Sequence, residues 1–371
     1  ICACMVALFH FGVVNHIGQF NLIKHAYLFV DFFFVLSGFV IALNYRSRLA
    51  EGFGFDRFVL MRLGRIYPLH FFTMLLFIPV ELVRYGMGSN LWHAIATNAL
   101  LLHGLGFNDA LWLNFPSWSI SAEFAAYLVF AIVVIRFGEG YLPWLIPVVV
   151  GPLVLGFVSP NGMNSTYDFG LIRCLYGFAL GVICFDLREG LPSLSRPVDG
   201  VTDTTIEVSA LFIVLIYFGL VSGPHSFAVV SPFLFTGLLL VFARGSGAVS
   251  RFLTTRPLLL IGTLSYSIYM THALVSVVFR AGAKVLEHMF GWQLFVTVGV
   301  LSNGEPQRLI SIARSPWFGD LLQIVMLLIT IALAMLTYRY VEEPGRLWSR
   351  KLASRLPKNR GAKQIIEPAN P

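Results

Sequence analysis

Five ionisable side chains stand out because they lie within apolar stretches of the sequence: His10, Asp31, Glu123, Arg173 and His272. A charge in the centre of a membrane span costs roughly 2.5–3.5 kcal/mol on insertion scales, so such residues are functional candidates with a partner to be found. A histidine paired with a carboxylate is the usual arrangement of a general base, because the carboxylate fixes the tautomer and stabilises the imidazolium. An arginine beside them could balance the acids or hold a developing oxyanion.

One shared site is expected because several of these side chains would lie at a similar depth in the membrane. With helices rising about 1.5 Å per residue, His10, Asp31, Glu123 and Arg173 are expected in one layer near the outer surface, and His272 about one turn deeper. Taken singly, each has a plainer explanation. Asp31 could cap its helix or snorkel, and a lone histidine is more often hydrogen-bonded packing. Their coincidence predicts a site, because several buried charges are tolerated only when they pair or line a watered cavity.

The elements that must position these residues follow from composition. The 371 residues are 57% hydrophobic and only 12% charged, far below the roughly 25% charged residues of a soluble domain. The chain is therefore expected to be a polytopic membrane protein. Its net charge of +7 arises from loops and the tail, as the positive-inside rule predicts, so a nucleic-acid partner is not expected. The four cysteines show no metal-ligand or disulfide spacing, and no metal site is expected.

Hydropathy predicts an all-α membrane protein with about ten transmembrane helices. The spans are expected near 1–15, 27–44, 66–84, 119–135, 143–158, 169–186, 206–221, 228–243, 258–279 and 319–340. Lys and Arg concentrate in one set of alternate loops, which places both termini in the cytoplasm. If the apolar stretch 91–106 crossed the membrane, every later basic loop would lie outside the cell. The stretch is therefore expected to be re-entrant or interfacial.

The ends of the chain set the expected domain limits. The first apolar stretch, Ile1–Val14, is shorter than a full span, so the first helix is expected to begin upstream of Ile1. A transmembrane domain is expected over residues 1–344. Residues 345–371 are expected to form a basic cytoplasmic tail that lies on anionic lipid and becomes disordered.

Three arginines, Arg57, Arg62 and Arg65, mark the cytoplasmic mouth of the third span. They have two explanations. They could be the positive charges that set topology, or they could converge on a polyphosphate, because guanidinium groups bind phosphate oxygens bidentately. A phosphate-binding site at the cytoplasmic face and a base near the outer surface would suit an activated donor that extends through the protein.

Seven separated stretches resemble the signatures of acyltransferase family 3, membrane proteins that O-acylate bacterial surface polysaccharides. The stretches are LFHF at 8–11, FVDFFFVLSGFVI beginning at Phe29, RLGRIYP at 62–68, PSWSISAEFAAYL at 116–128, RCLYGFALG at 173–181, LSYSIYMTH at 264–272 and YVEEP at 340–344. Their order covers nearly the whole chain, which makes the resemblance specific.

The resemblance implies a membrane-bound O-acyltransferase of the bacterial inner membrane. The donor would be cytoplasmic acyl-CoA, taken as acetyl-CoA, with no bound cofactor, and the acceptor would be a hydroxyl of an extracytoplasmic glycan or lipid-linked saccharide. It implies His10 as the catalytic residue, with Asp31 and Glu123 as acidic companions. The substrate-binding positions that it implies are Arg62, Arg65, Tyr67, Ser119, Arg173, Tyr266 and His272.

Two other functions remain open from the sequence. A proton-coupled transporter or flippase of an anionic or lipid-linked compound would use the charged layer as a proton relay, although neither paired repeats nor broken helices in both halves are apparent. A membrane interaction protein without activity would leave the charged layer unexplained. Consumption of a thioester in the presence of polysaccharide would distinguish all three.

Overall fold

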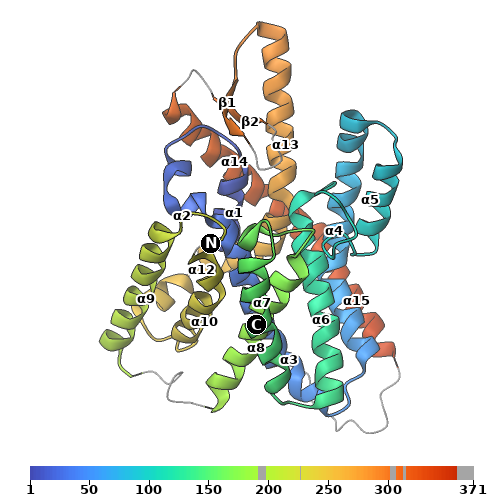
Figure 1. Cartoon of the computed structure of the whole chain (residues 1–371), viewed down its shortest axis with the longest axis vertical. Helices are drawn as coiled ribbons and strands as arrows, with labels where there is room; N and C mark the ends of the chain where they lie inside the picture. The colour runs from blue at the N-terminus through green and yellow to red at the C-terminus, as the bar shows by residue number, and fades with distance from the viewer. Residues whose placement is uncertain (191–197, 226, 301–305, 312–314, 357–371) are drawn as a thin grey trace.

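The computed structural model describes residues 1–190, 198–225, 227–300, 306–311 and 315–356 (Figure 1). Within them the chain is almost entirely helical. The α-helices are α1 (Cys2–His10), α2 (Asn21–Lys24), α3 (Phe29–Ala50), α4 (Phe55–Tyr85), α5 (Ser89–Ala99), α6 (Trp118–Phe137), α7 (Leu142–Phe157), α8 (Gly170–Gly190), α9 (Gly200–Leu220), α10 (Ser231–Phe242), α11 (Ala248–Leu253), α12 (Arg256–Thr263), α13 (Ser265–Phe290), α14 (Pro316–Thr337) and α15 (Glu343–Arg355). The strands are β1 (Phe295–Val300) and β2 (Pro306–Ile310).

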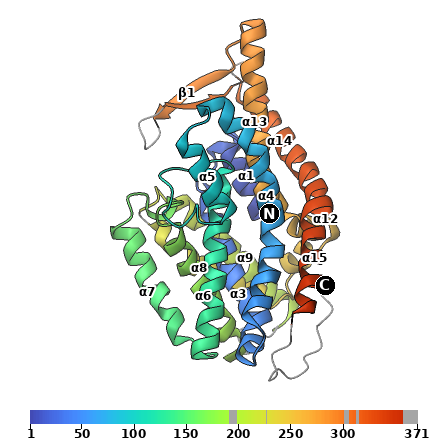
Figure 2. The same cartoon turned by 90° about the vertical axis from the view of Figure 1, so that its right-hand side faces the viewer.

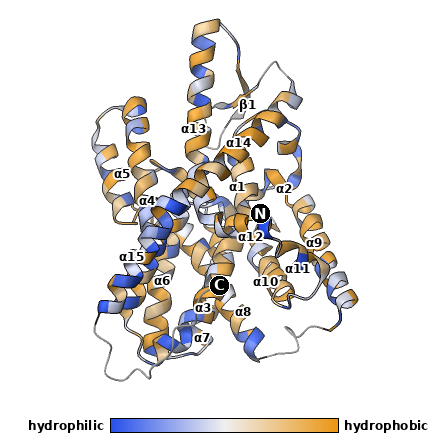
Figure 3. Ribbon diagram, turned by 180° about the vertical axis from the view of Figure 1, so that it is seen from behind, coloured by the Kyte–Doolittle hydropathy of each residue, from blue (hydrophilic) through white to orange (hydrophobic). Residues whose placement is uncertain are grey.

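Long apolar helices dominate because lipid leaves the backbone no other hydrogen-bond partners. Among the described residues, six helical segments are long and apolar enough to cross a membrane: Ala26–Ala50, Phe55–Tyr85, Phe115–Phe137, Gly170–Gly190, Gly200–Leu220 and Pro316–Arg355. The bent pair of α12 and α13 makes a seventh if it is one span. Figure 3 shows hydrophobic colouring along most of these helices. The helical membrane architecture is thus confirmed. The number of ten spans stays a prediction, because the three other expected spans fall on shorter helices. The cytoplasmic position of both termini stays a prediction as well.

The ninth expected span is not one straight helix. α12 and α13 meet at a bend of 68°, and α13 then continues to Phe290, well beyond the expected end near residue 279. It projects past the other helices, with the hairpin of β1 and β2 beside it (Figure 1). The hairpin is tied to the end of the first helical segment, because the backbone N–H of Val14 donates to the Ile310 carbonyl at 2.8 Å. The described residues that follow Arg280 therefore include the last turns of α13 and both strands of the hairpin.

The segment 91–106 holds α5, whose 11 residues are too few to cross a bilayer. Its polar residues contact neighbouring elements. The carbonyl of Asn98 lies 2.9 Å from Nε2 of His70 on α4, and Nε2 of His103 lies 3.0 Å from the Ser117 hydroxyl. These contacts hold the segment against α4 and against the start of α6.

The helical part of the chain extends beyond the expected domain boundary at residue 344. A π-helical segment, Tyr338–Glu342, joins α14 to α15, and α15 packs along α4 (Figure 2). The close approach is possible because Gly64 and Gly345 carry no side chain, so that Ser349 and Pro68 fit against them. Residues 345–355 therefore belong to the packed domain, in contrast to the expected tail, and residues 357–371 lie outside the described residues.

The centre of the domain is the contact between α3 and α8, whose backbones nearly touch. A Cβ atom added to Gly38 would lie 2.0 Å from the Phe178 carbonyl oxygen, and one added to Gly181 would lie 2.0 Å from the Val35 carbonyl oxygen. Small residues at helix crossings are typical of membrane proteins, where close packing rather than hydrophobic exclusion holds helices together.

We expect Gly38→Ala to destabilise the protein by about 1–3 kcal/mol, because the added methyl group forces the two backbones apart. The unfolding midpoint of the purified protein in detergent would measure the change. Gly237→Ala on α10 is the matched control, since a Cβ atom there meets nothing within 4 Å. An equal midpoint for both variants would contradict the proposed role of Gly38.

Candidate active site

Asp31 on α3 and Arg173 on α8 form a fully buried ion pair. Nε and Nη2 of Arg173 donate to the two carboxylate oxygens of Asp31, each at 2.8 Å. Two further hydrogen bonds go to backbone carbonyls, because Nη1 donates to the Ser165 carbonyl at 3.1 Å and Nη2 also donates to the Tyr27 carbonyl at 2.9 Å. The guanidinium lies 5.4 Å from the Trp118 ring centroid. Arg173 thus balances the charge of Asp31 and connects α3 and α8 with the 3-10 helix Ala26–Leu28 and with the loop at Ser165.

His10 pairs with another histidine, which corrects the expectation of a histidine–carboxylate pair. Nδ1 of His10, at the end of α1, lies 3.2 Å from Nε2 of His272 on α13. His272 is buried and His10 is partly exposed. The ring of Phe115 stands edge-on to His10, with centroids 5.0 Å apart. Asp31 pairs with Arg173 instead of His10, and a bidentate guanidinium–carboxylate contact is among the strongest hydrogen-bonded pairs.

The contact between the two rings needs one proton, and either nitrogen of the contact can carry it. If Nδ1 of His10 carries the proton and donates it to His272, then Nε2 of His10 keeps a free lone pair. That nitrogen is the one available to act as a base.

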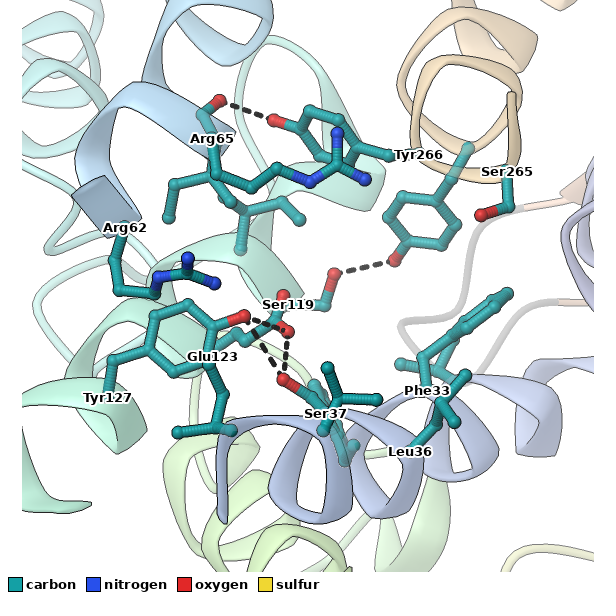
Figure 4. A pocket seen from close by; sticks show the side chains of 17 residues that line it. Phe33, Leu36, Ser37, Arg62, Arg65, Ser119, Glu123, Tyr127, Ser265 and Tyr266 are labelled. Carbon is teal, nitrogen blue, oxygen red and sulfur yellow. Dashed lines mark hydrogen bonds between the residues drawn. The ribbon is translucent and has the colours of Figure 1, made fainter. Parts of the chain in front are cut away.

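Glu123 lies in a different place, in a cavity between α3, α4, α6 and α13. The cavity has a volume of about 250 Å³. The Ser37 hydroxyl donates to Oε1 of Glu123 at 2.5 Å, and the Tyr127 hydroxyl donates to the same oxygen at 2.6 Å. Figure 4 shows these three side chains converging on the cavity. Glu123 is therefore held as a hydrogen-bonded acceptor in the cavity wall.

Two of the three arginines expected at the inner mouth line this cavity. Nη2 of Arg62 donates to the Tyr45 hydroxyl at 2.7 Å. Arg65 forms an ion pair with Glu342, whose second oxygen accepts from the Ser267 hydroxyl at 2.6 Å. Both guanidinium groups face the space between the helices (Figure 4).

The third arginine and one expected donor-binding residue lie outside the cavity lining. Arg57 donates from Nη2 to the Leu356 carbonyl at 2.8 Å. Tyr67 donates its hydroxyl proton to the Ala99 carbonyl at 2.9 Å. The three-arginine clamp suggested by the sequence is thus reduced to two members, and Tyr67 connects α4 to α5.

A hydroxyl cluster forms the wall between the cavity and the two histidines. Ser119 and Tyr269 both line the cavity. The Tyr269 hydroxyl lies 2.8 Å from Oγ of Ser119 and 2.9 Å from the Pro116 carbonyl oxygen. On its other side, the Tyr269 ring centroid is 5.8 Å from that of His272. Neither His10 nor His272 is among the residues that line the cavity.

Four residues of this arrangement were not predicted as site residues, although they fall in stretches that carried the resemblance. They are Ser37, Tyr127, Tyr269 and Glu342. Tyr266, which was expected, lines the cavity and donates its hydroxyl proton to the Ile66 carbonyl. Within the described ranges no group of three or more His, Cys, Asp and Glu side chains could hold a metal ion.

Comparison with known proteins identifies relatives. The family model described as an acyltransferase domain matches residues 1–339. O-acetyltransferase OatA of Staphylococcus aureus is 24% identical over 94% of this chain and 57% of its own length. Acyltransferase MdmB of Streptomyces mycarofaciens is 31% identical over 35% of this chain and 34% of its own length.

A further relative, protein 2 in the picA locus of Rhizobium radiobacter, is 34% identical over 29% of this chain and 65% of its own length. The chain thus spans less than two thirds of each of these relatives. No solved structure matches the chain.

Proposed function

Since the chain belongs to the acyltransferase-domain family, we propose that it is a membrane O-acyltransferase that moves an acyl group, first of all acetyl, from acyl-CoA to a hydroxyl of an extracytoplasmic glycan or lipid-linked saccharide. The observation that carries the proposal is the juxtaposition of two sites. A cavity with two arginines and a carboxylate lies on one side of Tyr269, and a histidine pair lies on the other. The name of the OatA relative supports O-acetyl transfer.

The cavity is the proposed donor site. Arg62 and Arg65 supply guanidinium groups for the phosphates of the donor, because this group binds phosphate oxygens in a planar, bidentate geometry. Apolar side chains of α3 and α4, such as Val30, Leu36 and Ile66, make up much of the remaining wall. Such a wall suits an uncharged pantetheine arm and its thioester. The donor would enter from the cytoplasm, in a bacterial inner membrane.

His10 is the proposed base. Its Nε2 takes the proton of the acceptor hydroxyl as the oxygen attacks the thioester carbonyl carbon, and His272 holds the other nitrogen in place. The new C–O bond forms, the C–S bond breaks, and the imidazolium returns the proton to the departing thiolate. A route in which His10 briefly carries the acyl group uses the same nitrogen and stays open.

The direct test of this function uses the purified protein in lipid nanodiscs with acetyl-CoA and a polysaccharide acceptor. Release of the CoA thiol together with labelled acetyl ester on the polysaccharide is expected. Thiol release without ester, or transport of the acceptor without thiol release, would contradict the proposal and favour a hydrolase or a transporter.

Arg62→Ala is expected to raise the KM for acyl-CoA about ten- to one-hundred-fold, because a hydrogen bond to a charged group is worth about 1.5–3 kcal/mol. The kcat should change little, since the contact lies away from the reacting carbon. Arg62 is a cleaner target than Arg65, whose removal leaves the buried Glu342 without its partner. Arg57→Ala is the matched control, because Arg57 does not line the cavity. An unchanged KM in Arg62→Ala would remove the proposed donor contact.

A further inference from the structure

The attack on a thioester produces an oxyanion, and the structure restricts which groups can stabilise it. Arg173 was one candidate from the sequence. Its guanidinium is committed to Asp31 and to the carbonyls of Tyr27 and Ser165, and the side chain is 1% exposed. Four of its five N–H groups are thus engaged, and Arg173 is not among the residues that line the donor cavity. The stabilising donors must be sought elsewhere.

The hydroxyls of Tyr269 and Ser119 lie where such donors are needed. Both residues line the end of the donor cavity, and both are 4–5% exposed. Tyr269 is also the neighbour of His272, one turn earlier on α13, and His272 contacts His10. A thioester carbonyl that lies between the cavity and His10 would pass these two hydroxyls.

The hydrogen bonding of this pair leaves one proton free for a substrate. The Pro116 carbonyl oxygen lies 2.9 Å from the Tyr269 hydroxyl and 3.1 Å from the Ser119 hydroxyl, and the two hydroxyls are 2.8 Å apart. The two hydroxyls thus share one backbone acceptor. Ser119 alone can satisfy Pro116, so Tyr269 can turn its proton toward a ligand without leaving a buried carbonyl unpaired.

We propose that Tyr269, with Ser119 beside it, stabilises the oxyanion of the acyl-transfer reaction. This inference rests on the proposed function. As the acceptor oxygen bonds to the carbonyl carbon, the C=O electron pair moves onto the carbonyl oxygen, which accepts a hydrogen bond from the Tyr269 hydroxyl. The hydroxyl proton of the acceptor passes to Nε2 of His10. The oxyanion then collapses, the C–S bond breaks, and the CoA thiolate takes the proton from the imidazolium.

Tyr269→Phe tests the inference, because it removes the hydroxyl and keeps the ring that packs against Phe33 and His272. Loss of one oxyanion donor lowers kcat by about 10²–10³. The KM for acyl-CoA is expected to stay within about twofold, since the hydroxyl acts mainly on the transition state. The double variant Tyr269→Phe with Ser119→Ala should lower kcat by less than the product of the reductions in the two single variants, because the two hydroxyls share one acceptor.

Tyr176→Phe is the matched control. Its hydroxyl also donates to a backbone carbonyl, that of Val229, at 2.9 Å, but Tyr176 does not line the cavity. Equal kcat values for Tyr269→Phe and Tyr176→Phe, in proteins with unchanged unfolding midpoints, would overturn the inference. So would a rise in KM without a fall in kcat. A wild-type protein that transfers no acyl group would instead contradict the proposed function, so the two failures are distinguishable.

Discussion

His10→Ala is expected to lower acyl transfer by about a thousandfold or more while the protein remains folded. A positioned general base contributes about 10²–10⁴ to a rate, and a residue that also carries the acyl group would contribute more. The side chain of His10 stands at the end of α1 and is partly exposed, so its removal leaves no large cavity. Labelled ester on the acceptor is the quantity to measure, at saturating acyl-CoA.

His25→Ala is the control for this experiment. His25 follows α2 directly, and its Nδ1 lies 3.1 Å from the Asn21 carbonyl oxygen. His272→Gln provides a graded variant, because an amide can still hold Nδ1 of His10 but cannot act as an imidazole. We expect His272→Gln to retain more activity than His10→Ala. Wild-type activity in His10→Ala would contradict the assignment of His10 as the base.

The fold could be predicted from sequence where hydropathy alone determines structure. α3, α4, α6 and α8 lie where apolar runs placed them, because lipid permits few backbone alternatives. The bend before Ser265 and the π-helical segment at Tyr338–Glu342 could not be predicted in this way. Both are local departures from a straight α-helix, and hydropathy averages over such departures.

In the candidate site, too, the sequence predicts some features and leaves others undetermined. Depth along a helix can be counted from the sequence, and in the structure Asp31 and Arg173 are buried while His10 and Glu123 are partly buried. The direction in which each side chain points depends on how the helices rotate against one another. Arg173 and Asp31 therefore face each other, Glu123 faces the cavity, and His10 faces His272.

The motif resemblance indicated candidate positions, but it did not separate tyrosines that connect helices from tyrosines that face the cavity. Tyr67 falls within a recognised stretch, yet its hydroxyl donates to Ala99 and holds α5. Tyr269 falls within another stretch and was not predicted, although it lies between the cavity and His272. Sequence position cannot distinguish a tyrosine that connects helices from one that faces a substrate, because both keep a buried hydroxyl hydrogen-bonded.

Asp31→Asn is expected to destabilise the protein by about 3–5 kcal/mol, because it leaves Arg173 as an uncompensated buried charge. Both side chains are at most 1% exposed, so solvent cannot replace the lost partner. The unfolding midpoint and the yield of folded protein in detergent would report the change. Glu189→Gln is the control, since its pair with Arg188 is 59% exposed on the glutamate side and such pairs contribute little.

The double variant Asp31→Asn with Arg173→Met separates a structural role of Asp31 from a catalytic one. Removing both charges should restore part of the stability, as replacement of buried ion pairs by apolar groups often does. The recovery should be incomplete, because the carbonyls of Tyr27 and Ser165 lose their donor. If Asp31 only positions α3 against α8, activity per folded molecule should recover along with stability. A double variant that regains stability and stays inactive would instead place Asp31 in the reaction itself, beside His10, as the sequence first suggested.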